Sequence, residues 1–170
     1  MQSKTSQSLR YLTMSAVFCA AVYIATALFP ITIPGTTGYI HLGDAFIYLA
    51  AAILPTPYAC CVGAVGAGLA DLFVAPMWVP GTMIIKSLSS LMFTAKKDKL
   101  LCKRNLIAVI PAGLLCVSGY YLYEAILYSN FIAPLTGIVF NIAQAAASAI
   151  IFNVIGYTFD RLGLKNRIMK

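Results

Sequence analysis

The sequence predicts an all-α integral membrane protein built as a bundle of six transmembrane helices. Of its 170 residues, 61% are hydrophobic and only 10% are charged, and the mean hydropathy is +0.86. Because soluble domains are roughly half apolar, this composition excludes an ordinary soluble protein. The longest polar stretch is 96–105, which leaves no room for a separate soluble domain. Residues 1–170 are therefore expected to form one membrane-embedded unit.

Apolar runs define the six predicted helices. A membrane-spanning helix needs about 20 residues, and shorter runs are allowed where a helix is buried or does not cross completely. The runs that meet this criterion are 10–29, 41–54, 58–75, 79–95, 106–128 and 134–160. The second run is short, so a re-entrant segment is the alternative for it.

In this interpretation the first three runs are separate helices, and the first is a membrane helix rather than a cleaved signal peptide. Lys4 and Arg10 precede the first run, but that run is too long for the core of a typical signal peptide and further apolar runs follow it. Pro55-Thr56-Pro57 separates the second run from the third and predicts a turn.

Basic residues support this topology. With a turn at Pro55, the loop 96–104 lies on the same side as both termini, and so do all twelve Lys and Arg residues except Lys86. Merging the second and third runs would move the loop to the opposite side, against the positive-inside rule. Both termini are therefore predicted to be cytoplasmic. The net charge of +7 is explained by orientation in the cell membrane rather than by nucleic-acid binding.

The five cysteines predict packing rather than chemistry. Their number is odd, and their spacing fits neither a metal site nor a disulfide framework. Cys60 and Cys61 are adjacent and point to different faces of a helix, which disfavours a shared metal. No metal and no cofactor is expected. No HExxH, GxSxG or Walker sequence occurs in the chain, so an enzyme is not expected.

Most polar residues within the predicted helices lie in the outer half of the bundle. Charged groups are costly in hydrocarbon, so ionisable residues there suggest a functional site. The polar residues of the outer half are His41, Asp44, Asp71, Lys86, Glu124, Asn141 and Gln144, of which the first five are ionisable. Lys86 lies about 10 Å into its helix at 1.5 Å per residue. Asn153, in the inner half, is assigned to helix packing.

Helical spacing places these residues on shared faces. The three polar or aromatic stripes are His41, Asp44 and Tyr48; Tyr120, Glu124 and Tyr128; and Asn141, Gln144 and Ser148. Three such stripes imply helices that face a common interior. They predict an outward-opening ligand pocket whose lining also includes Tyr39 and Trp78.

Each of these residues also has a structural explanation. Lys86 and Asp71 are equally consistent with a buried ion pair that binds nothing. His41 and the tyrosines are also residues of the membrane interface. Asn141 and Gln144 are typical of hydrogen bonds between membrane helices.

Small residues at intervals of four predict close helix contacts. Ala16 and Ala20 form such a pair in the first helix, and Ala59, Gly63 and Ala67 form a row in the third. Internal packing is the preferred interpretation for the third helix.

Three segments resemble a known family. The succession GYIHLGDAFIYLAAAILP, GAVGAGLADLF and WVPGTMIIKSLSSLMF resembles the substrate-binding S component of energy-coupling factor (ECF) transporters. Within it, the chain is similar to the riboflavin-transporter-like group that includes hydroxymethylpyrimidine and pyridoxine proteins. The resemblance covers residues 10–160. It implies a six-helix bundle that captures a vitamin or precursor at the outer face and docks onto a membrane coupling subunit with two cytoplasmic ATPase subunits.

The resemblance also implies roles for individual residues. Ala16 and Ala20 resemble the patch that contacts the coupling subunit, the segment 30–40 resembles the loop that closes over the substrate, and the outer polar residues resemble the ligand shell. The three acids Asp44, Asp71 and Glu124, with one lysine and abundant tyrosine, favour a small neutral or weakly basic heteroaromatic such as pyridoxine or hydroxymethylpyrimidine. Two rivals remain: an ion-coupled secondary transporter that uses these acids, and a structural membrane subunit without a ligand.

Overall fold

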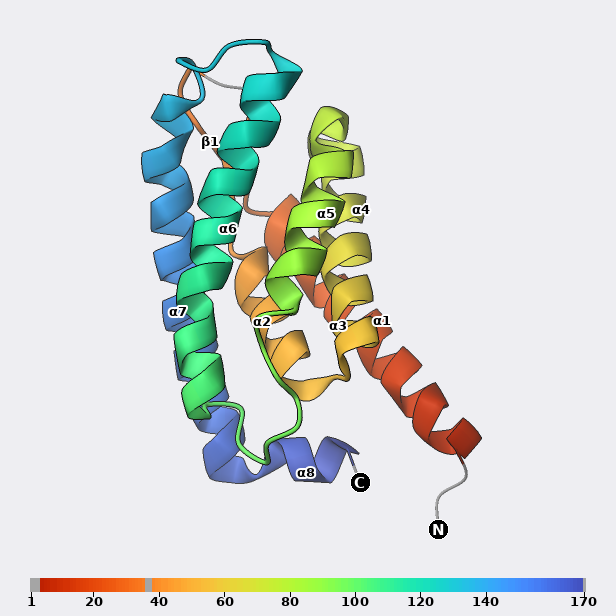
Figure 1. Ribbon diagram of the computed structural model, residues 1–170. Coiled ribbons are helices and arrows are strands. Elements are labelled where there is room, and N and C mark those ends of the chain that lie inside the picture. The colour runs from red at the N-terminus through yellow and green to blue at the C-terminus, as the bar shows by residue number, and fades with distance from the viewer. Residues whose placement is uncertain (1–3, 36–37, 170) are drawn as a thin grey trace.

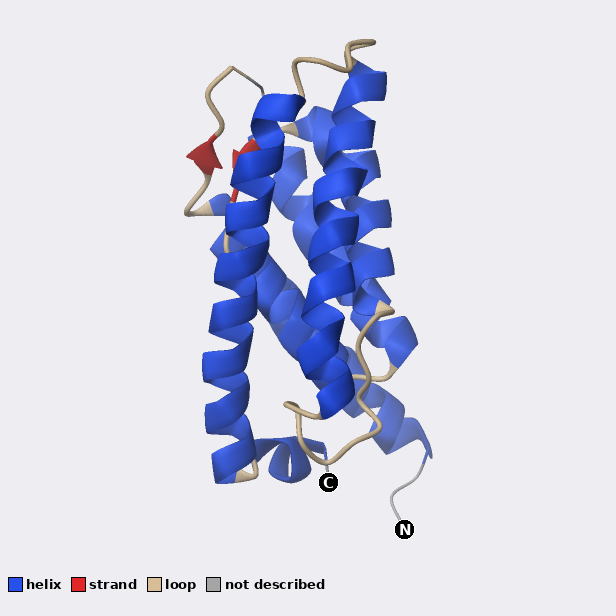
Figure 2. Ribbon diagram, turned by 60° about the vertical axis from the view of Figure 1, so that its left-hand side comes forward, coloured by secondary structure: helices blue, strands red, loops and turns tan. Residues whose placement is uncertain are grey.

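The computed structural model describes residues 4–35 and 38–169, and these are almost entirely helical (Figure 1, Figure 2). Its elements are α1 (Lys4–Ala27), β1 (Ile31–Thr32), β2 (Tyr39–Ile40), α2 (Gly43–Ile53), α3 (Thr56–Cys61), η1 (Val62–Gly66), α4 (Ala67–Val74), η2 (Pro76–Trp78), α5 (Val79–Ser90), α6 (Lys103–Leu127), α7 (Leu135–Leu162) and α8 (Leu164–Met169). The predicted all-α class is confirmed. Residues 36–37, which belong to the loop expected to close over the substrate, and residues 1–3 and 170 lie outside the described residues.

Four helices in the described part of the chain are long and apolar enough to cross a membrane: Thr5–Ala27, Thr56–Val74, Lys103–Leu127 and Leu135–Leu162. The second of these combines α3, η1 and α4. The other two predicted spans correspond to shorter helices, α2 with 11 residues and α5 with 12. Six membrane crossings therefore remain a prediction.

The helix α2 is short because it is enclosed by the bundle. Every one of its residues except Phe46 is buried, and it packs against α1, α5 and α7. A helix that is apolar on all sides belongs inside the protein, so its length need not match the thickness of the bilayer. The predicted turn after it is confirmed, since α2 ends at Ile53 and α3 begins at Thr56.

The predicted helix 79–95 ends early, at Ser90, so its last five positions were predicted wrongly. The Asn105 side chain binds the main chain of the following segment. Its Oδ1 accepts from the Thr94 amide at 2.8 Å, and its Nδ2 donates to the carbonyls of Thr94 and Leu100 at 2.9 Å. These bonds hold residues near Thr94 in a loop, although the sequence there is apolar.

Small residues bring the helices close together, as predicted for the third span. Ala59, Gly63 and Ala67 are all buried. A Cβ on Gly63 would lie 2.7 Å from the Lys86 carbonyl oxygen, so glycine allows η1 to pack directly on α5. This contact fixes the position of Lys86 in the bundle.

The two ends of the bundle differ in structure. At one end, called here the terminal end, lie the start of α1, the helix α8 and the loop between α5 and α6 (Figure 1). At the other, called the strand end, lie the β1–β2 hairpin and the α6–α7 loop. In the antiparallel hairpin, Ile31 pairs with Ile40 and Thr32 with Tyr39. The start of α1 and α8 thus share one end, and their cytoplasmic location remains a prediction.

Candidate ligand-binding site

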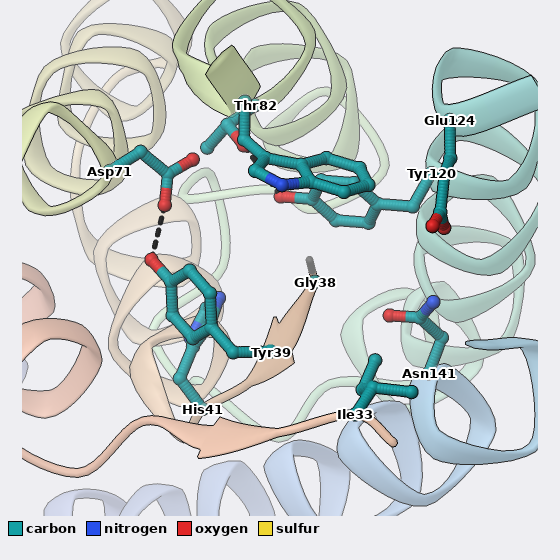
Figure 3. A pocket seen from close by; sticks show the side chains of 10 residues that line it. Ile33, Gly38, Tyr39, His41, Asp71, Thr82, Tyr120, Glu124 and Asn141 are labelled. Atoms are coloured by element: carbon teal, nitrogen blue, oxygen red, sulfur yellow. Dashed lines mark hydrogen bonds between the residues drawn. The ribbon is translucent and has the colours of Figure 1, made fainter. Parts of the chain in front are cut away.

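A partly enclosed cavity lies at the strand end (Figure 3). It contains about 380 Å³ of space free of protein atoms, part of which is open solvent. Its lining residues are Ile33, Gly38, Tyr39, His41, Asp71, Trp78, Thr82, Tyr120, Glu124 and Asn141. Seven of them were predicted as ligand-binding residues: Tyr39, His41, Asp71, Trp78, Tyr120, Glu124 and Asn141. The lining comes from both sides of the hairpin and from α4, η2, α5, α6 and α7, so residues distant in sequence meet at one site.

Two acidic residues lie on different sides of the cavity. Asp71 accepts a hydrogen bond from the Tyr39 hydroxyl on one side, and Glu124 lies beside Asn141 on the other (Figure 3). Burial, and next the nearby Asp71 carboxylate, raise the pKa of Tyr39 above its usual range. Tyr39 therefore stays neutral and acts as the donor.

Aromatic and hydroxyl side chains form another part of the lining. The Trp78 ring lies 5.9 Å from the Tyr120 ring between centroids. The Thr82 Oγ1 and the Tyr120 hydroxyl are 3.0 Å apart and share a hydrogen bond. Trp78 is only 5% exposed, and its Nε1 has no acceptor within residues 4–35 and 38–169. The indole N–H is thus a buried donor at the cavity without a partner among the described residues.

The neutral form of His41 is fixed by its neighbours. Its Nδ1 accepts from the Gly43 amide at 3.1 Å and lies 3.3 Å from the Thr26 hydroxyl. An imidazole nitrogen that accepts a hydrogen bond carries no proton, so the hydrogen of His41 is assigned to Nε2. Gly43 is required here, because a Cβ at this position would collide with the Thr26 side chain.

Three predicted site residues, Asp44, Lys86 and Gln144, lie behind the lining rather than in it. Lys86 Nζ is 2.6 Å from Asp44 Oδ1. Gln144 Nε2 donates to Asp44 Oδ2 at 2.9 Å, and its Oε1 accepts from the His41 amide at 2.8 Å. These contacts tie the buried network to the cavity residue His41. The network therefore supports the lining from behind.

The pairing of Lys86 corrects one of the sequence-based alternatives. The buried partner of Lys86 is Asp44 and not Asp71. The helices α2 and α5 pack against each other, and this contact brings the two side chains together. Lys86 is fully buried, and its Nζ also lies 4.9 Å from the centre of the Tyr120 ring.

Sequence reasoning missed several residues at the site. The lining includes Thr82, Ile33 and Gly38, and Cys116 belongs to the network behind it, with its Sγ 3.5 Å from Lys86 Nζ. Helical spacing contained a signal for two of them. Thr82 lies four residues before Lys86, and Cys116 lies four residues before Tyr120, so each shares a helix face with a predicted site residue.

The surface of α1 carries the two alanines predicted to contact a partner. Ala16 and Ala20 are both exposed, and they lie near the exposed Leu12 and Val17. The alanine pair of α1 thus faces outward, whereas the small residues of the third span are buried.

The fold and cavity define a multi-pass integral membrane protein with a polar, aromatic cavity at one end of its helices. Residues 6–160 match the family model described as "ECF-type riboflavin transporter, S component". A protein of Pyrococcus woesei, described as "Uncharacterized protein in gap 3'region", is 31% identical over 144 residues, which is 83% of this chain and 95% of that protein. The chain belongs to the family of ECF-type riboflavin transporter S components.

Family membership settles the class of activity. An S component is the substrate-capturing subunit of an ECF transporter and not an enzyme. S components are integral membrane proteins that bind small vitamin substrates and associate with the membrane and ATPase modules of the transporter.

Proposed function

We propose that this S component captures a small neutral or weakly basic heteroaromatic vitamin or precursor, such as pyridoxine or hydroxymethylpyrimidine. The observation that carries the proposal is the cavity, whose lining combines aromatic rings with a few polar groups. Ligand pockets are commonly built in this way, with apolar surface for binding and polar groups for orientation. Tyr120 and Trp78 supply ring surface, and Asp71 and Asn141 supply hydrogen-bonding groups.

The cavity opens to the outside in the proposed orientation. Six helices cross the membrane, and both termini are cytoplasmic. The basic residues of the α5–α6 loop lie at the terminal end, which supports this orientation through the positive-inside rule. The strand end then faces the substrate supply.

A small ligand suits the modest space. Asp71 and Tyr39 orient the polar edge of the ligand, Trp78 and Tyr120 cover its ring, and a large flavin fits less well. Asp44, Lys86 and Gln144 position this lining through the buried network instead of touching the ligand. The β1–β2 hairpin contributes Tyr39 to the cavity, so its closure over the ligand would complete the site.

The exposed alanines of α1 serve as the docking surface for the membrane coupling subunit. Small side chains allow close approach of membrane helices, and Ala16 and Ala20 are both accessible on α1. Two cytoplasmic ATPase subunits then drive release of the ligand to the inside.

Analysis of retained small molecules tests the capture function. Protein purified in mild detergent is examined by mass spectrometry, and its melting temperature is measured with and without pyridoxine or hydroxymethylpyrimidine. We expect a retained single-ring compound and a rise in melting temperature, because a ligand at 100 times its Kd stabilises by about 2.7 kcal/mol. A flat response to both compounds and to other vitamins, with nothing retained, would favour a structural subunit. Uptake by the isolated protein in vesicles would favour an ion-coupled carrier.

Bulky substitutions on α1 test the docking surface separately. Ala16→Trp and Ala20→Trp should lower ATP-driven uptake at least about tenfold, since 1.4 kcal/mol of lost association energy is a factor of ten. Ligand affinity of the isolated subunit should not change. Val154→Trp, at an exposed position of α7, is the control and should leave uptake intact. Equal loss of uptake in all three variants would contradict docking at the alanines.

A further inference from the structure

The charges that line the cavity are of one sign. Asp71 and Glu124 are acidic, and no Lys or Arg is among the described lining residues. Lys86 is fully buried behind the lining and paired with Asp44 at 2.6 Å. His41 is neutral, because its Nδ1 accepts from the Gly43 amide. A ligand in the cavity therefore meets negative charge without a compensating cation.

The two acids differ in their partners. Asp71 accepts a hydrogen bond from the Tyr39 hydroxyl. Glu124 is 6% exposed, and within residues 4–35 and 38–169 its carboxylate receives no hydrogen bond and forms no ion pair. The Glu124 carboxylate lines the cavity, where a ligand group can pair with it. Among the described residues, Glu124 is thus the cavity acid without a partner.

A second unsatisfied group lines the same cavity. The buried Trp78 Nε1 is a donor without an acceptor in the described residues. The ring face of Trp78 also attracts cations, because aromatic faces carry partial negative charge, whereas Lys86 Nζ already lies over the Tyr120 ring at 4.9 Å. Within the described residues, the site therefore offers one free donor, one free acidic acceptor and the Trp78 ring surface.

We propose that the ligand is a cation: a single heteroaromatic ring with a protonated amino group that binds the Glu124 carboxylate. A ring nitrogen or hydroxyl of the ligand accepts the hydrogen bond of Trp78 Nε1. This inference rests on the proposed capture of a heteroaromatic vitamin or precursor and selects the basic members of that class. It also excludes anionic relatives, because Glu124 and Asp71 would repel them.

A matched series of pyridine compounds tests the charge preference. Pyridoxamine, pyridoxine and 4-pyridoxic acid share one ring and carry a cationic aminomethyl, a neutral hydroxymethyl and an anionic carboxyl group, respectively. Binding to the full-length protein in detergent is measured by calorimetry at neutral pH. Pyridoxamine should bind at least about tenfold more tightly than pyridoxine, in keeping with the greater strength of charge-assisted hydrogen bonds. The acid should show no binding.

Substitutions of Glu124 assign the preference to this residue. Glu124→Gln should remove the advantage of pyridoxamine over pyridoxine, because the amide keeps the size and polarity of the side chain but not its charge. Glu124→Asp retains the charge and should keep part of the advantage. Melting temperatures of both variants verify that they are folded.

The outcomes separate this inference from the proposed function. Pyridoxine binding as tightly as pyridoxamine, or Glu124→Gln weakening both equally, overturns the cationic ligand and leaves capture of a heteroaromatic intact. Failure of pyridoxamine to bind overturns it as well. In that case, a neutral ring compound retained by the purified protein would still support the proposed function, whereas the absence of any retained molecule would count against both.

Discussion

A buried lysine lies behind the cavity and another lies at the terminal end, and the two are stabilised differently. Lys86 is paired with a carboxylate, Asp44, at 2.6 Å. Lys165 is 7% exposed, and its Nζ donates instead to three main-chain carbonyls, of Ala52 and Ala95 at 2.8 Å and of Lys97 at 2.6 Å. All three ammonium donors of Lys165 are used in this way. The terminal lysine holds separate segments together.

Neighbouring polar groups repeat this contrast. At the terminal end, the Asp160 carboxylate accepts from the amides of Leu100 and Leu101 at 2.7 and 2.9 Å. At the cavity, Trp78 Nε1 is buried without a partner in the described residues, and so are the Tyr48 hydroxyl and Ser148 Oγ inside the bundle and Arg10 Nη1 in α1. Buried polar groups in native proteins are nearly always satisfied. Lys165 and Asp160 therefore act as scaffold at the terminal end, while Trp78 retains a donor for a ligand at the cavity.

Breaking the Asp44–Lys86 pair should have the largest effect. Lys86→Met leaves a buried carboxylate without its counter-charge, and removing one member of such a pair costs about 3–5 kcal/mol. We expect a strong fall in melting temperature, and a smaller one in the double variant Asp44→Asn/Lys86→Met. Melting curves of the single and double variants form the test. An equally stable Lys86→Met protein that binds ligand poorly would instead place Lys86 in direct contact with the ligand.

Removing the terminal lysine should have an intermediate effect and should leave binding intact. Lys165→Met deprives three carbonyls of their donor, and an unsatisfied buried group costs about 1–3 kcal/mol. The melting temperature should fall, while ligand affinity of the folded protein stays the same. Arg167→Met, at an exposed position of the same helix α8, is the matched control. Loss of affinity in Lys165→Met would remove the distinction between scaffold and site.

The sequence predicted the cavity lining better than the network behind it. Polar residues in membrane helices avoid lipid, so Asp71, Glu124 and Asn141 were expected to face a common interior, and the structure brings them to one cavity. The partner of Lys86 depends on how α2 and α5 cross, and spacing within one helix does not record that. Asp71 was the partner considered for Lys86 from the sequence, whereas the structure pairs Lys86 with Asp44.

The terminal end was the least predictable region. Lys165 was counted only as one of the basic residues that orient the protein. Its role depends on contacts with Ala52 and Ala95, which are far from it in sequence. Asn105 likewise binds the main chain after α5, so an apolar segment forms a loop where hydropathy alone predicts helix. Main-chain acceptors leave no trace in composition or periodicity.

The smallest effect is expected from Tyr39→Phe, which removes the hydroxyl that donates to Asp71. A typical hydrogen bond contributes about 0.5–1.5 kcal/mol, so the melting temperature should change little. Ligand affinity should fall about 3–10-fold, because Asp71 loses the donor that orients its carboxylate at the cavity. Calorimetry and melting curves on the same samples separate these two effects.

Tyr157→Phe is the matched control, since Tyr157 lies exposed on α7 and outside the cavity lining. It should change neither quantity. A Tyr39→Phe protein with unaltered affinity and a loss of stability as large as that of Lys165→Met would show that the Tyr39–Asp71 contact belongs to the scaffold. Glu124 would then be the acid that remains available to a ligand. The cavity would differ from the terminal end through Glu124 and Trp78 Nε1, which line it and have no partners among the described residues.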